Sequence, residues 1–417
     1  MRMVPDPRCK WKKKHDMAEV LTCLVAGYVT GHTTLRRCLV WCARHQEWLK
    51  KMGLGLRNGI ASIATVSRML SRMDEELFLF AFMEWIGEIL DTKGLHLAID
   101  GKAIRAAASK VRGTKAPMLL NALDTATGLV LAQLPIQNKE CEITQIPELL
   151  KLLDIRGSVI TTDAIGTQTS IMEQIRGQGG HFLLMVKKNQ PLSYEEIVRQ
   201  FGELEKDRER MRKESACHSQ YPELMEAYDE TSSFEKNRDR YEYRKYQACS
   251  HPAIVSRTRK EWPFLKSVGC VRQTRILMIR DADGVDITPD EATFREKGTF
   301  RQPKPEAGDH ERSDIQTVGL ISDVEMTAEE MGRCRREHWT VENRLHHVLD
   351  DTFREDRSPA KGSKNNLALI RKFAYNILRL AMLHLSTERP MTEMMDLFSD
   401  DGELLERYLF KGIESFY

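Results

Sequence analysis

The first part of the chain has the spacing of amphipathic helices. Between residues 16 and 91, Ala, Leu, Met and Val recur three or four positions apart, with breaks near Gly31 and between Gly53 and Gly59. Such spacing places apolar side chains on one face of a helix, and the glycines mark turns between helices. We therefore predict a small helical domain over residues 1–91.

One short segment of this domain has the features of a helix that contacts DNA. Ser62 is a good N-cap for a helix from Ile63 to Met73, and a turn containing glycine precedes it. This arrangement is compatible with a helix-turn-helix that recognises DNA. Turns of this kind are also common in helical domains that bind no DNA, and both alternatives stay open.

From Leu95 onward the apolar positions form short runs that are typical of strands. LHLAID, APMLLNALD and GLVLAQLPI follow one another closely, separated by turn-like segments, and predict an antiparallel meander. A helix at Ile146–Leu153, the strand SVITTDA, a helix at Ser170–Ile175 and the strand HFLLMVKKN then alternate. This alternation predicts parallel pairing and an α/β fold.

The remainder of the chain contains a polar segment and then two helices. Residues 193–320 have a mixed pattern, with strands expected at YEYRKYQAC, LKSVGCVRQ and RILMIRD, and we interpret them as an insertion. A long helix is expected from Thr327, which forms a capping box with Glu330, to Phe353, and a second helix follows over residues 366–385. The buried face of the long helix would consist of Met331, Cys334, Val341, Leu345 and Val348.

Composition says more about the cellular compartment of the protein than about its function. The 63 Lys and Arg and the 61 Asp and Glu leave a net charge of +2, so any DNA contact requires local clusters of basic residues. The nine cysteines form no CxxC pair and the first residues lack the apolar core of a signal peptide, which favours the reducing cytoplasm. The apolar stretches are too short or too interrupted by charge to cross a bilayer, so no membrane span is expected.

Two aspartates follow predicted strands of the sheet. Asp100 ends LHLAID and Asp163 ends SVITTD, each directly after an apolar run. A parallel strand beside the first would put both carboxylates at the same edge of the sheet. Each aspartate alone is more typical of the turn that follows a strand, but the two together strengthen the case for a site.

Glu342, on the predicted long helix, is the third candidate acid. It follows Val341 and so lies at the border of the buried face, where its carboxylate can reach the sheet. Solvated glutamates on helices are much more common, and other acids lie near it in the sequence. These alternatives are Asp350, Asp351, Glu355 and Asp356.

Three carboxylates around one point suit Mg²⁺ or Mn²⁺. Both ions prefer oxygen ligands and keep positions for water and for phosphate oxygens of a substrate. Two such ions can assist the transfer of a phosphoryl group between an attacking and a leaving oxygen. The three acids therefore indicate metal-dependent chemistry on phosphodiesters.

The motifs around these acids resemble those of a known family. IDGKAIR contains Asp100, TTDAIGTQ contains Asp163, and HWTVENRLHHVLDDTFRED contains Glu342. Together they resemble the motifs of the DDE transposases, specifically the ISAs-type group that includes the H-repeat-associated proteins. The resemblance extends over nearly the whole chain, from residue 6 to residue 379.

The resemblance implies an α/β fold with a ribonuclease-H-like catalytic core, in which helices flank a mixed sheet. It also implies a β-rich insertion and an N-terminal helical domain. The expected parts are an end-binding helical domain at 1–91, the first part of the core at 92–200, the insertion at 201–322, the C-terminal helical part of the core at 323–390, and a tail at 391–417.

The resemblance also implies roles for single residues. Asp100, Asp163 and Glu342 would be the catalytic metal ligands for Mg²⁺ or Mn²⁺, with two ions when DNA is bound, and NKECEI and VKKNQ resemble further family motifs. The predicted DNA contacts are Lys102, Arg105, Lys139, Lys187, Lys188, Asn189, Arg336 and Asn343. Further basic residues extend this region: Arg344, Arg354, Arg357, Lys361, Lys364, Arg371 and Lys372. For Lys102 and Arg105 a solvated surface position is an equal alternative.

Several histidines and cysteines are weaker candidates for a site. His338 and His346 lie one helical turn on either side of Glu342 and can orient a carboxylate or a phosphate, although helix packing accounts for them as well. Three groups of Cys and His have irregular spacing, which favours free cysteines over zinc ligands. These groups are Cys38 with Cys42 and His45, Cys217 with His218, and Cys249 with His251.

The chain departs from the family pattern at a few positions. His347 and Asp351 stand where the family usually has tryptophan and valine, and VGLISD replaces a tyrosine-rich strand before the last helix. None of these departures removes a candidate metal ligand.

The sequence therefore predicts a DNA transposase of an insertion sequence. It would bind terminal inverted repeats and target DNA, cleave and transfer strands, and form a dimer or larger assembly on DNA in the bacterial cytoplasm, at the nucleoid. The alternative is a noncatalytic transposase, domesticated or decaying, that only binds DNA. A nuclease without strand transfer is a third possibility.

Overall fold

The chain divides into two compact units. The computed structural model describes residues 3–9, 13–104, 118–136, 141–213, 219, 222–237, 240–259, 262–278, 283–286, 315–357 and 363–411. The first unit comprises Met1–Val159, Gln178–Gly180 and Glu337–Tyr417, and the second comprises Ile160–Gly177 and His181–Arg336. Helices flank strands in each unit, so the predicted α/β class is confirmed.

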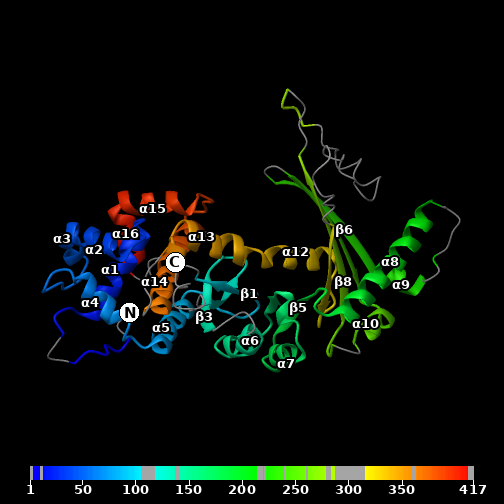
Figure 1. Ribbon diagram of the computed structural model, residues 1–417, viewed down its shortest axis with the longest axis horizontal. Helices are drawn as coiled ribbons and strands as arrows, with labels where there is room; N and C mark the ends of the chain where they lie inside the picture. The colour runs from blue at the N-terminus through cyan, green and yellow to red at the C-terminus, as the bar shows by residue number, and fades with distance from the viewer. Residues whose placement is uncertain are drawn as a thin grey trace, which may run out of the picture. The chain divides into compact units, whose positions relative to one another are not determined.

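Helices from both ends of the chain pack together in the first unit (Figure 1). The central helix is α14, which contacts α1, α5, α15 and α16, and it is buried on nearly every side. The helices of this group are α1 (Met17–Val29), α2 (Leu35–Arg44), α3 (Gln46–Lys51), α4 (Ile63–Leu70), α5 (Glu75–Gly87), α14 (Lys364–His384), α15 (Met391–Asp400) and α16 (Gly402–Leu409). The helical pattern predicted for residues 16–91 is confirmed.

The predicted N-cap of α4 is also confirmed. The hydroxyl of Ser62 accepts a hydrogen bond from the backbone N–H of Thr65 at 3.3 Å, which satisfies one of the free donors of the first turn. The helix ends at Leu70 and not at Met73.

Helices α1 and α2 approach closely at Gly27. A Cβ atom added there would lie 2.5 Å from Cys38 Cβ and 2.8 Å from Cys38 Cα, so the two backbones would have to separate. We expect Gly27→Ala to cost about 1–3 kcal/mol by overpacking, more than the roughly 0.5–1 kcal/mol that alanine gains in a helix. Thermal unfolding should show a melting temperature a few degrees lower.

Gly87 in α5 provides the matched control. An added Cβ there meets nothing within 4 Å, and the residue has no positive φ. Gly87→Ala should therefore leave the melting temperature unchanged or raise it. Equal effects of the two substitutions would contradict the close helix contact.

The first three strands form the predicted antiparallel meander. They are β1 (His96–Ala103), β2 (Met118–Asp124) and β3 (Val130–Ile136). β1 pairs with β2, and Asp100 lies opposite Asn121; β2 pairs with β3. Helices α5, α14 and α6 (Glu142–Lys151) pack against β3. The meander thus holds Asp100 within a strand whose preceding residues are buried.

Strand β4 (Val159–Thr162) begins beside β1. The backbone N–H of Val159 donates to the carbonyl of Leu95 at 2.8 Å, and the N–H of Gly94 donates to the carbonyl of Arg156 at 3.0 Å. All four residues belong to the first unit. The two strands therefore start side by side. This agrees with the prediction that the strand SVITTD lies beside the strand LHLAID.

The second unit contains the remaining strands. In the order in which they neighbour one another they are β4, β5 (His181–Val186), β9 (Ile315–Ser322), β8 (Ser267–Leu277), β7 (Arg240–Cys249) and β6 (Tyr228–Asn237). The strands from β5 to β6 in this order pair antiparallel. Helices α7 (Thr169–Gly177), α8 (Pro191–Lys213) and α10 (Pro252–Arg259) contact them, and α9 (Pro222–Glu226) precedes β6.

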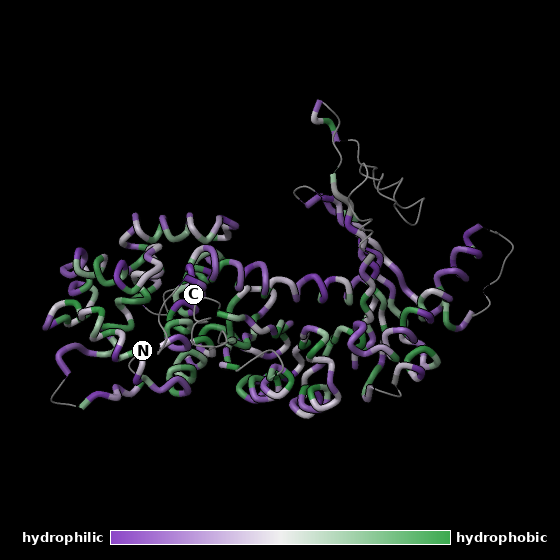
Figure 2. The backbone as a smooth tube through the Cα atoms, in the orientation of Figure 1, coloured by the Kyte–Doolittle hydropathy of each residue, from purple (hydrophilic) through white to green (hydrophobic). Residues whose placement is uncertain are grey.

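Two predictions for this unit were wrong. LKSVGCVRQ and the start of RILMIRD form one continuous strand, β8, because the polar positions between them continue the pairing with β7 and do not form a turn. The second error is α8, a helix of 23 residues where no helix was expected. Charge conceals it, since hydrophilic residues extend along much of its length (Figure 2), but Ile197, Phe201 and Leu204 give it a buried face at helical spacing.

The long C-terminal helix is not continuous. It consists of α12 (Ala328–His338), a π-helical segment η6 (Val341–His346) and α13 (His347–Asp351), followed by the short 3₁₀ turn η7 (Glu355–Arg357). The predicted capping box is confirmed, because Thr327 N–H donates to Glu330 Oε2 at 2.8 Å and Glu330 N–H to Thr327 Oγ1 at 3.2 Å. The wide turn of η6 shifts the buried face by one position, from the predicted Val348 to Leu349.

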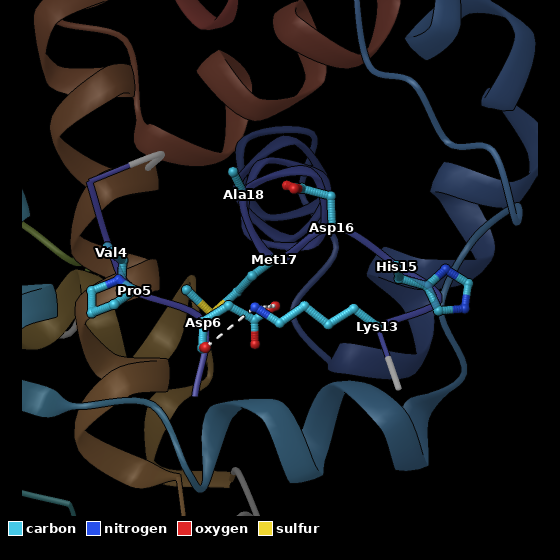
Figure 3. A pocket seen from close by; sticks show the side chains of 8 residues that line it. All are labelled: Val4, Pro5, Asp6, Lys13, His15, Asp16, Met17 and Ala18. Carbon is cyan, nitrogen blue, oxygen red and sulfur yellow. Dashed lines mark hydrogen bonds and ion pairs between the residues drawn. The ribbon is translucent and has the colours of Figure 1, made fainter. Parts of the chain in front are cut away.

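Two further features concern the outer surface. The described residues include no helix long and apolar enough to cross a membrane. A pocket of about 450 Å³ lies at the start of α1, where Lys13 approaches Asp6 to 3.5 Å (Figure 3). None of the predicted site residues lines it.

Candidate active site

Asp100 lies on β1 against a buried histidine. Its Oδ2 atom is 3.5 Å from His346 Nδ1, and its side chain is 23% exposed. The other ring nitrogen of His346 lies 3.3 Å from Asn121 Nδ2, which also donates to the carbonyl of Leu119. Asn121, the cross-strand neighbour of Asp100, therefore fixes the ring that faces the carboxylate.

The protonation of His346 follows from these contacts. An amide NH₂ group only donates, so Nε2 accepts and Nδ1 carries the proton that faces Asp100. Burial, helped by the positive charges of Lys102 and Lys372, lowers the pKa of His346 to about 3. At neutral pH the ring is therefore uncharged, and it lies beside Asp100 without neutralising its carboxylate.

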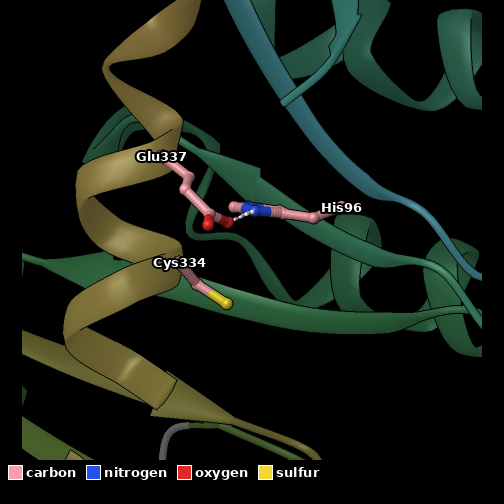
Figure 4. Close-up of side chains that lie close together, drawn as sticks. All are labelled: His96, Cys334 and Glu337. Carbon is pink, nitrogen blue, oxygen red and sulfur yellow. Dashed lines mark hydrogen bonds and ion pairs between the residues drawn. The ribbon is translucent and has the colours of Figure 1, made fainter. Parts of the chain in front are cut away.

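The segment that carries Glu342 runs along β1. At the start of the strand, His96 Nδ1 lies 2.9 Å from Glu337 Oε2 (Figure 4). Further along, Asp100 contacts His346, and Lys102 contacts Asp350. These strand residues are two or four positions apart and so share one face of β1.

Glu342 lies between these contacts in the chain. It is exposed and belongs to η6, which touches β1. Before it in the chain Glu337 contacts His96 of the strand, and after it His346 contacts Asp100. The structure thus brings Asp100 and the segment of Glu342 together in the first unit.

Lys102 lies in a buried cluster of charges. Its Nζ atom is 2.5 Å from Asp350 Oδ1 and 2.9 Å from Glu355 Oε2, and the residue is 5% exposed. Burial lowers the pKa of Lys102, but the two carboxylates outweigh this and the pKa lies above its ordinary value. The ammonium group binds these two carboxylates inside the protein. Sequence reasoning expected it to contact DNA or to be solvated.

Glu355 lies at the centre of this cluster and is fully buried. Burial raises the pKa of its carboxyl group, but Lys102, Lys372 and Arg371 outweigh this, and the pKa lies below its ordinary value. Lys372 is also fully buried, which lowers its pKa to about 8, and it donates to Gln133 Oε1 at 2.6 Å. Glu355 is thus the anion that compensates three buried cations.

The prediction that Arg371 and Lys372 extend a basic surface was wrong. Both belong to α14 and are buried, at 2% and 0% exposure. The guanidinium of Arg371 lies 3.7 Å from Glu355 and stacks over the ring of Tyr28 in α1, 5.4 Å from its centroid. Sequence reasoning placed both residues on a basic surface that faces DNA, because a sequence does not show that they are buried around Glu355.

Glu142 is a further acid at this place that sequence reasoning assigned no role. It is the first residue of α6 and is 2% exposed. A Cβ atom added at Gly101, the residue after Asp100, would collide with its carboxylate. The glycine of IDGKAIR thus permits the close approach of Glu142, and the NKECEI motif was the signal in the sequence.

In the second unit, Asp163 is placed by the residues after β5. It follows β4 directly, its side chain is 40% exposed, and Lys187 Nζ lies 3.3 Å from its Oδ1. Asn189 and Gln190 donate side-chain hydrogen bonds to the carbonyl of Ala164, at 3.1 and 3.2 Å. The motifs TTDAIGTQ and VKKNQ therefore form one local structure that holds the turn after Asp163.

The remaining predicted DNA contacts have different surroundings. Lys188 and Asn343 are exposed. Arg336 pairs with Glu235 at 2.8 Å in the second unit. Arg105 and Lys139 lie outside the described residues, as do Lys361 and the pair Cys217 and His218.

The departures from the family pattern leave this region intact. His347 and Asp351 are both exposed and pair with each other at 3.0 Å, one helical turn apart. VGLISD forms the end of β9, so a strand is present there despite the missing tyrosines. Cys38 and Cys42 are buried and donate to backbone carbonyls, as expected of free cysteines.

The chemistry of the donor set fits a hard divalent cation. Asp100 and Glu342 offer carboxylate oxygens in the first unit and Asp163 does so in the second, and all three side chains are at least partly accessible to solvent. Mg²⁺ and Mn²⁺ prefer such oxygens and retain water, which an accessible site allows. Sulfur ligands are absent from this set, which disfavours zinc.

Comparisons with known proteins agree on one family. The family model "Transposase DDE domain" matches residues 91–377, and the model "DDE_Tnp_1-associated" matches residues 1–86. The chain is 31% identical over 385 residues to the "H repeat-associated putative transposase YhhI" of Escherichia coli strain K12, with 90% of this chain and 88% of that one covered. It is 30% identical over 383 residues to the "Putative transposase YncI" of Escherichia coli O157:H7, covering 90% and 85%.

Among solved structures, the chain is similar to the piggyBac transposase in a synaptic complex with hairpin DNA. The TM-score is 0.38 and the sequence identity 12%, with 97% of this chain and 75% of that one covered.

Proposed function

This chain belongs to the DDE transposase domain family, and we propose that it is a metal-dependent DNA transposase with a ribonuclease-H-like core. It binds the ends of its insertion sequence, hydrolyses a phosphodiester at each end, and joins the freed end to target DNA. The observation that carries the proposal is the course of the Glu342 segment along β1, beside Asp100. This is the pairing that the sequence motifs require of two metal ligands.

The proposed ligands of Mg²⁺ or Mn²⁺ are Asp100, Asp163 and Glu342. The common starting point of β1 and β4, at Leu95 and Val159, supports the inclusion of Asp163, which follows β4 directly. When bound, the metal ions supply positive charge that stabilises the transition state of phosphoryl transfer. The hydrolytic step forms a bond from water to phosphorus and breaks the bond to the 3′-oxygen, which leaves as a hydroxyl.

The strand-transfer step uses this hydroxyl. Its oxygen attacks a phosphodiester of the target, a new bond to phosphorus forms, and the target's own 3′-oxygen leaves and takes up a proton. The number of phosphodiester bonds does not change, so the step needs no external energy source. The same carboxylates serve both steps.

Neighbouring residues position the carboxylates. The neutral ring of His346 lies 3.5 Å from the carboxylate of Asp100 and so limits its orientation while leaving its negative charge available. Lys187 neutralises part of the charge of Asp163, and in the complex it is free to turn to a DNA phosphate. For Lys102 we propose an internal role in place of the phosphate contact, because two carboxylates already hold it.

DNA recognition is assigned to exposed parts of the chain. The N-terminal helices, with α4 as a candidate for the major groove, would bind the terminal inverted repeats. Lys188 and Asn343 are exposed and available to the DNA backbone. Because a transposition event requires two ends, we propose a dimer or larger assembly on DNA.

The proposal is tested with DNA that carries the sequences flanking the coding region. The chain should bind this DNA, release a 3′-hydroxyl end when Mg²⁺ or Mn²⁺ is added, and form joined products with a target duplex. Chelation with EDTA should remove cleavage and joining and leave binding unchanged. Binding that is never followed by metal-dependent cleavage would support the alternative, a noncatalytic DNA-binding protein. Cleavage without joined DNA would indicate a nuclease.

A further inference from the structure

One face of the sheet in the second unit carries a group of arginines. Arg244 of β7 lies opposite Ser233 of β6 and Gln273 of β8, and cross-strand partners point to the same face of a sheet. Helix α12 packs on this face, because a Cβ atom added at Gly332 would lie 2.9 Å from the ring of Tyr246. The arginine cluster on this face comprises Arg240, Arg244 and Arg275 from the strands and Arg335 and Arg336 from α12.

Glu242 is the acid at the centre of the arginine cluster and is 2% exposed. Its Oε1 atom lies 2.8 Å from Arg240 Nε and 3.5 Å from Arg275 Nε. Its Oε2 atom accepts a hydrogen bond from Arg244. One carboxylate thus serves three guanidinium groups.

The other acids of this face compensate little more of the charge. Glu235 already bridges Arg244 and Arg336, at 2.9 and 2.8 Å. Asp229, at the start of β6, accepts a hydrogen bond of 2.8 Å from the backbone N–H of Ala328, the first residue of α12. Positive charge therefore remains in excess among the described residues of this face.

Arg335 has no carboxylate of its own. It is 5% exposed, and it makes no hydrogen bond or ion pair with any residue that the structure describes. Burial lowers the pKa of its guanidinium, and the positive charges of Arg244 and Arg275 lower it further. A buried charge is costly unless it is paired, so an anion at this point would stabilise the fold.

Two enclosed hydroxyl groups adjoin the same point. Ser233 Oγ and Tyr246 Oη are buried and make no hydrogen bond within the described part of the chain. Ser233 lies across the strand pair from Arg244, and Tyr246 lies two positions after it on the same face of β7. Buried polar groups are nearly always hydrogen-bonded, and both hydroxyls can donate to an anion.

We propose that the arginine cluster binds one small tetrahedral oxyanion, of the size of inorganic phosphate, between α12 and the sheet. The planar fork of donors on each arginine matches two oxygens of such an ion. The enclosed hydroxyls and the buried Arg335 favour the free ion over a phosphodiester of DNA, because the flanking sugars would have to enter the same space. The site lies within the second unit, and it does not depend on the proposed function.

The test measures thermal unfolding and calorimetric binding of the whole chain with inorganic phosphate. Millimolar phosphate should raise the melting temperature of the wild type by several degrees, because a ligand that binds only the folded state stabilises it. The titration should show one ion per chain. Chloride at the same ionic strength is the reference, since it screens repulsion among the arginines without filling the site.

Three variants locate the effect. Arg335→Met removes the buried guanidinium, so in chloride it should melt no lower than the wild type, and phosphate should no longer raise its melting temperature. Tyr246→Phe removes one enclosed hydroxyl and should weaken phosphate binding by about tenfold. Arg257→Met is the matched control, because Arg257 is exposed in α10 of the same unit, and it should respond to phosphate as the wild type does.

A phosphate response that survives Arg335→Met, or that chloride reproduces, would overturn the inference, as would the absence of binding at millimolar phosphate. A melting temperature of Arg335→Met far below that of the wild type in chloride would mean that the protein itself compensates this charge, and it would count equally against the site. Short duplex DNA of unrelated sequence should not displace the phosphate. Displacement would show that the site is open to a phosphodiester and would contradict the enclosed free ion.

Discussion

Replacing Asp100 or Asp163 with asparagine, or Glu342 with glutamine, should each reduce the rate of strand cleavage by about a thousandfold or more. The amides keep the size of the side chains but remove the negative charge that holds a divalent cation. Since these groups act as one unit, the loss should be similar for each variant, and a double variant should be little worse than a single one. The measurement is cleavage of labelled end DNA with Mg²⁺, together with the affinity for that DNA.

Affinity should stay within a few-fold of the wild type, because most of the binding energy comes from contacts with DNA phosphates elsewhere. Asp351→Asn is the matched control, since Asp351 is 67% exposed and follows the same segment as Glu342. It should cleave at the wild-type rate. A variant at Asp100 that still cleaves efficiently, or an inactive Asp351 variant, would refute the assignment of the acids.

Glu355→Gln should lower the free energy of unfolding by about 3–5 kcal/mol, the cost of leaving buried charges without a partner. Glu355 is fully buried, and the positive charges of Lys102, Lys372 and Arg371 all act on its carboxylate. Glutamine fits the space but removes the one charge that acts on all three cations, and only Lys102 keeps another carboxylate partner, Asp350. For a protein of ordinary stability this is a large part of the total. Denaturant unfolding of the whole chain measures it.

Glu84→Gln is the control for Glu355, because Glu84 is an exposed glutamate of the same unit, and the change should be within about 0.5 kcal/mol. A second comparison separates charge from packing. In the Glu355→Gln background, Lys372→Met removes one of the unpaired cations and should recover part of the lost stability. If the double variant is as unstable as the sum of the single variants, the charge explanation is wrong.

Much of the fold could be predicted from the sequence. The helices around α14 and the meander β1–β3 have regular patterns of apolar residues, and these patterns were sufficient. The errors arose where charged residues or an irregular helical turn concealed the pattern of apolar positions. Helix α8 buries only a narrow face among many charged residues, and the π-helical turn of η6 adds a residue that no periodic pattern contains.

Less of the candidate site could be predicted. The three acids follow from strand ends and motifs, but the surroundings depend on residues that are distant in the sequence. Lys102 meets Glu355 across 253 positions, and Asn121 meets His346 across 225. A sequence marks such residues as charged or polar, but only the fold determines whether they face DNA or one another.

The central claim, that one metal centre uses the three acids, is tested most directly by locating Mn²⁺. Crystals of the chain with end DNA and Mn²⁺, measured at a wavelength where manganese scatters anomalously, would show each ion as a peak. We predict peaks within ligand distance of Asp100, Asp163 and Glu342, next to a DNA phosphate. Mn²⁺ bound instead at other acids, such as Asp350 or Asp356, with Glu342 left out, would contradict the account.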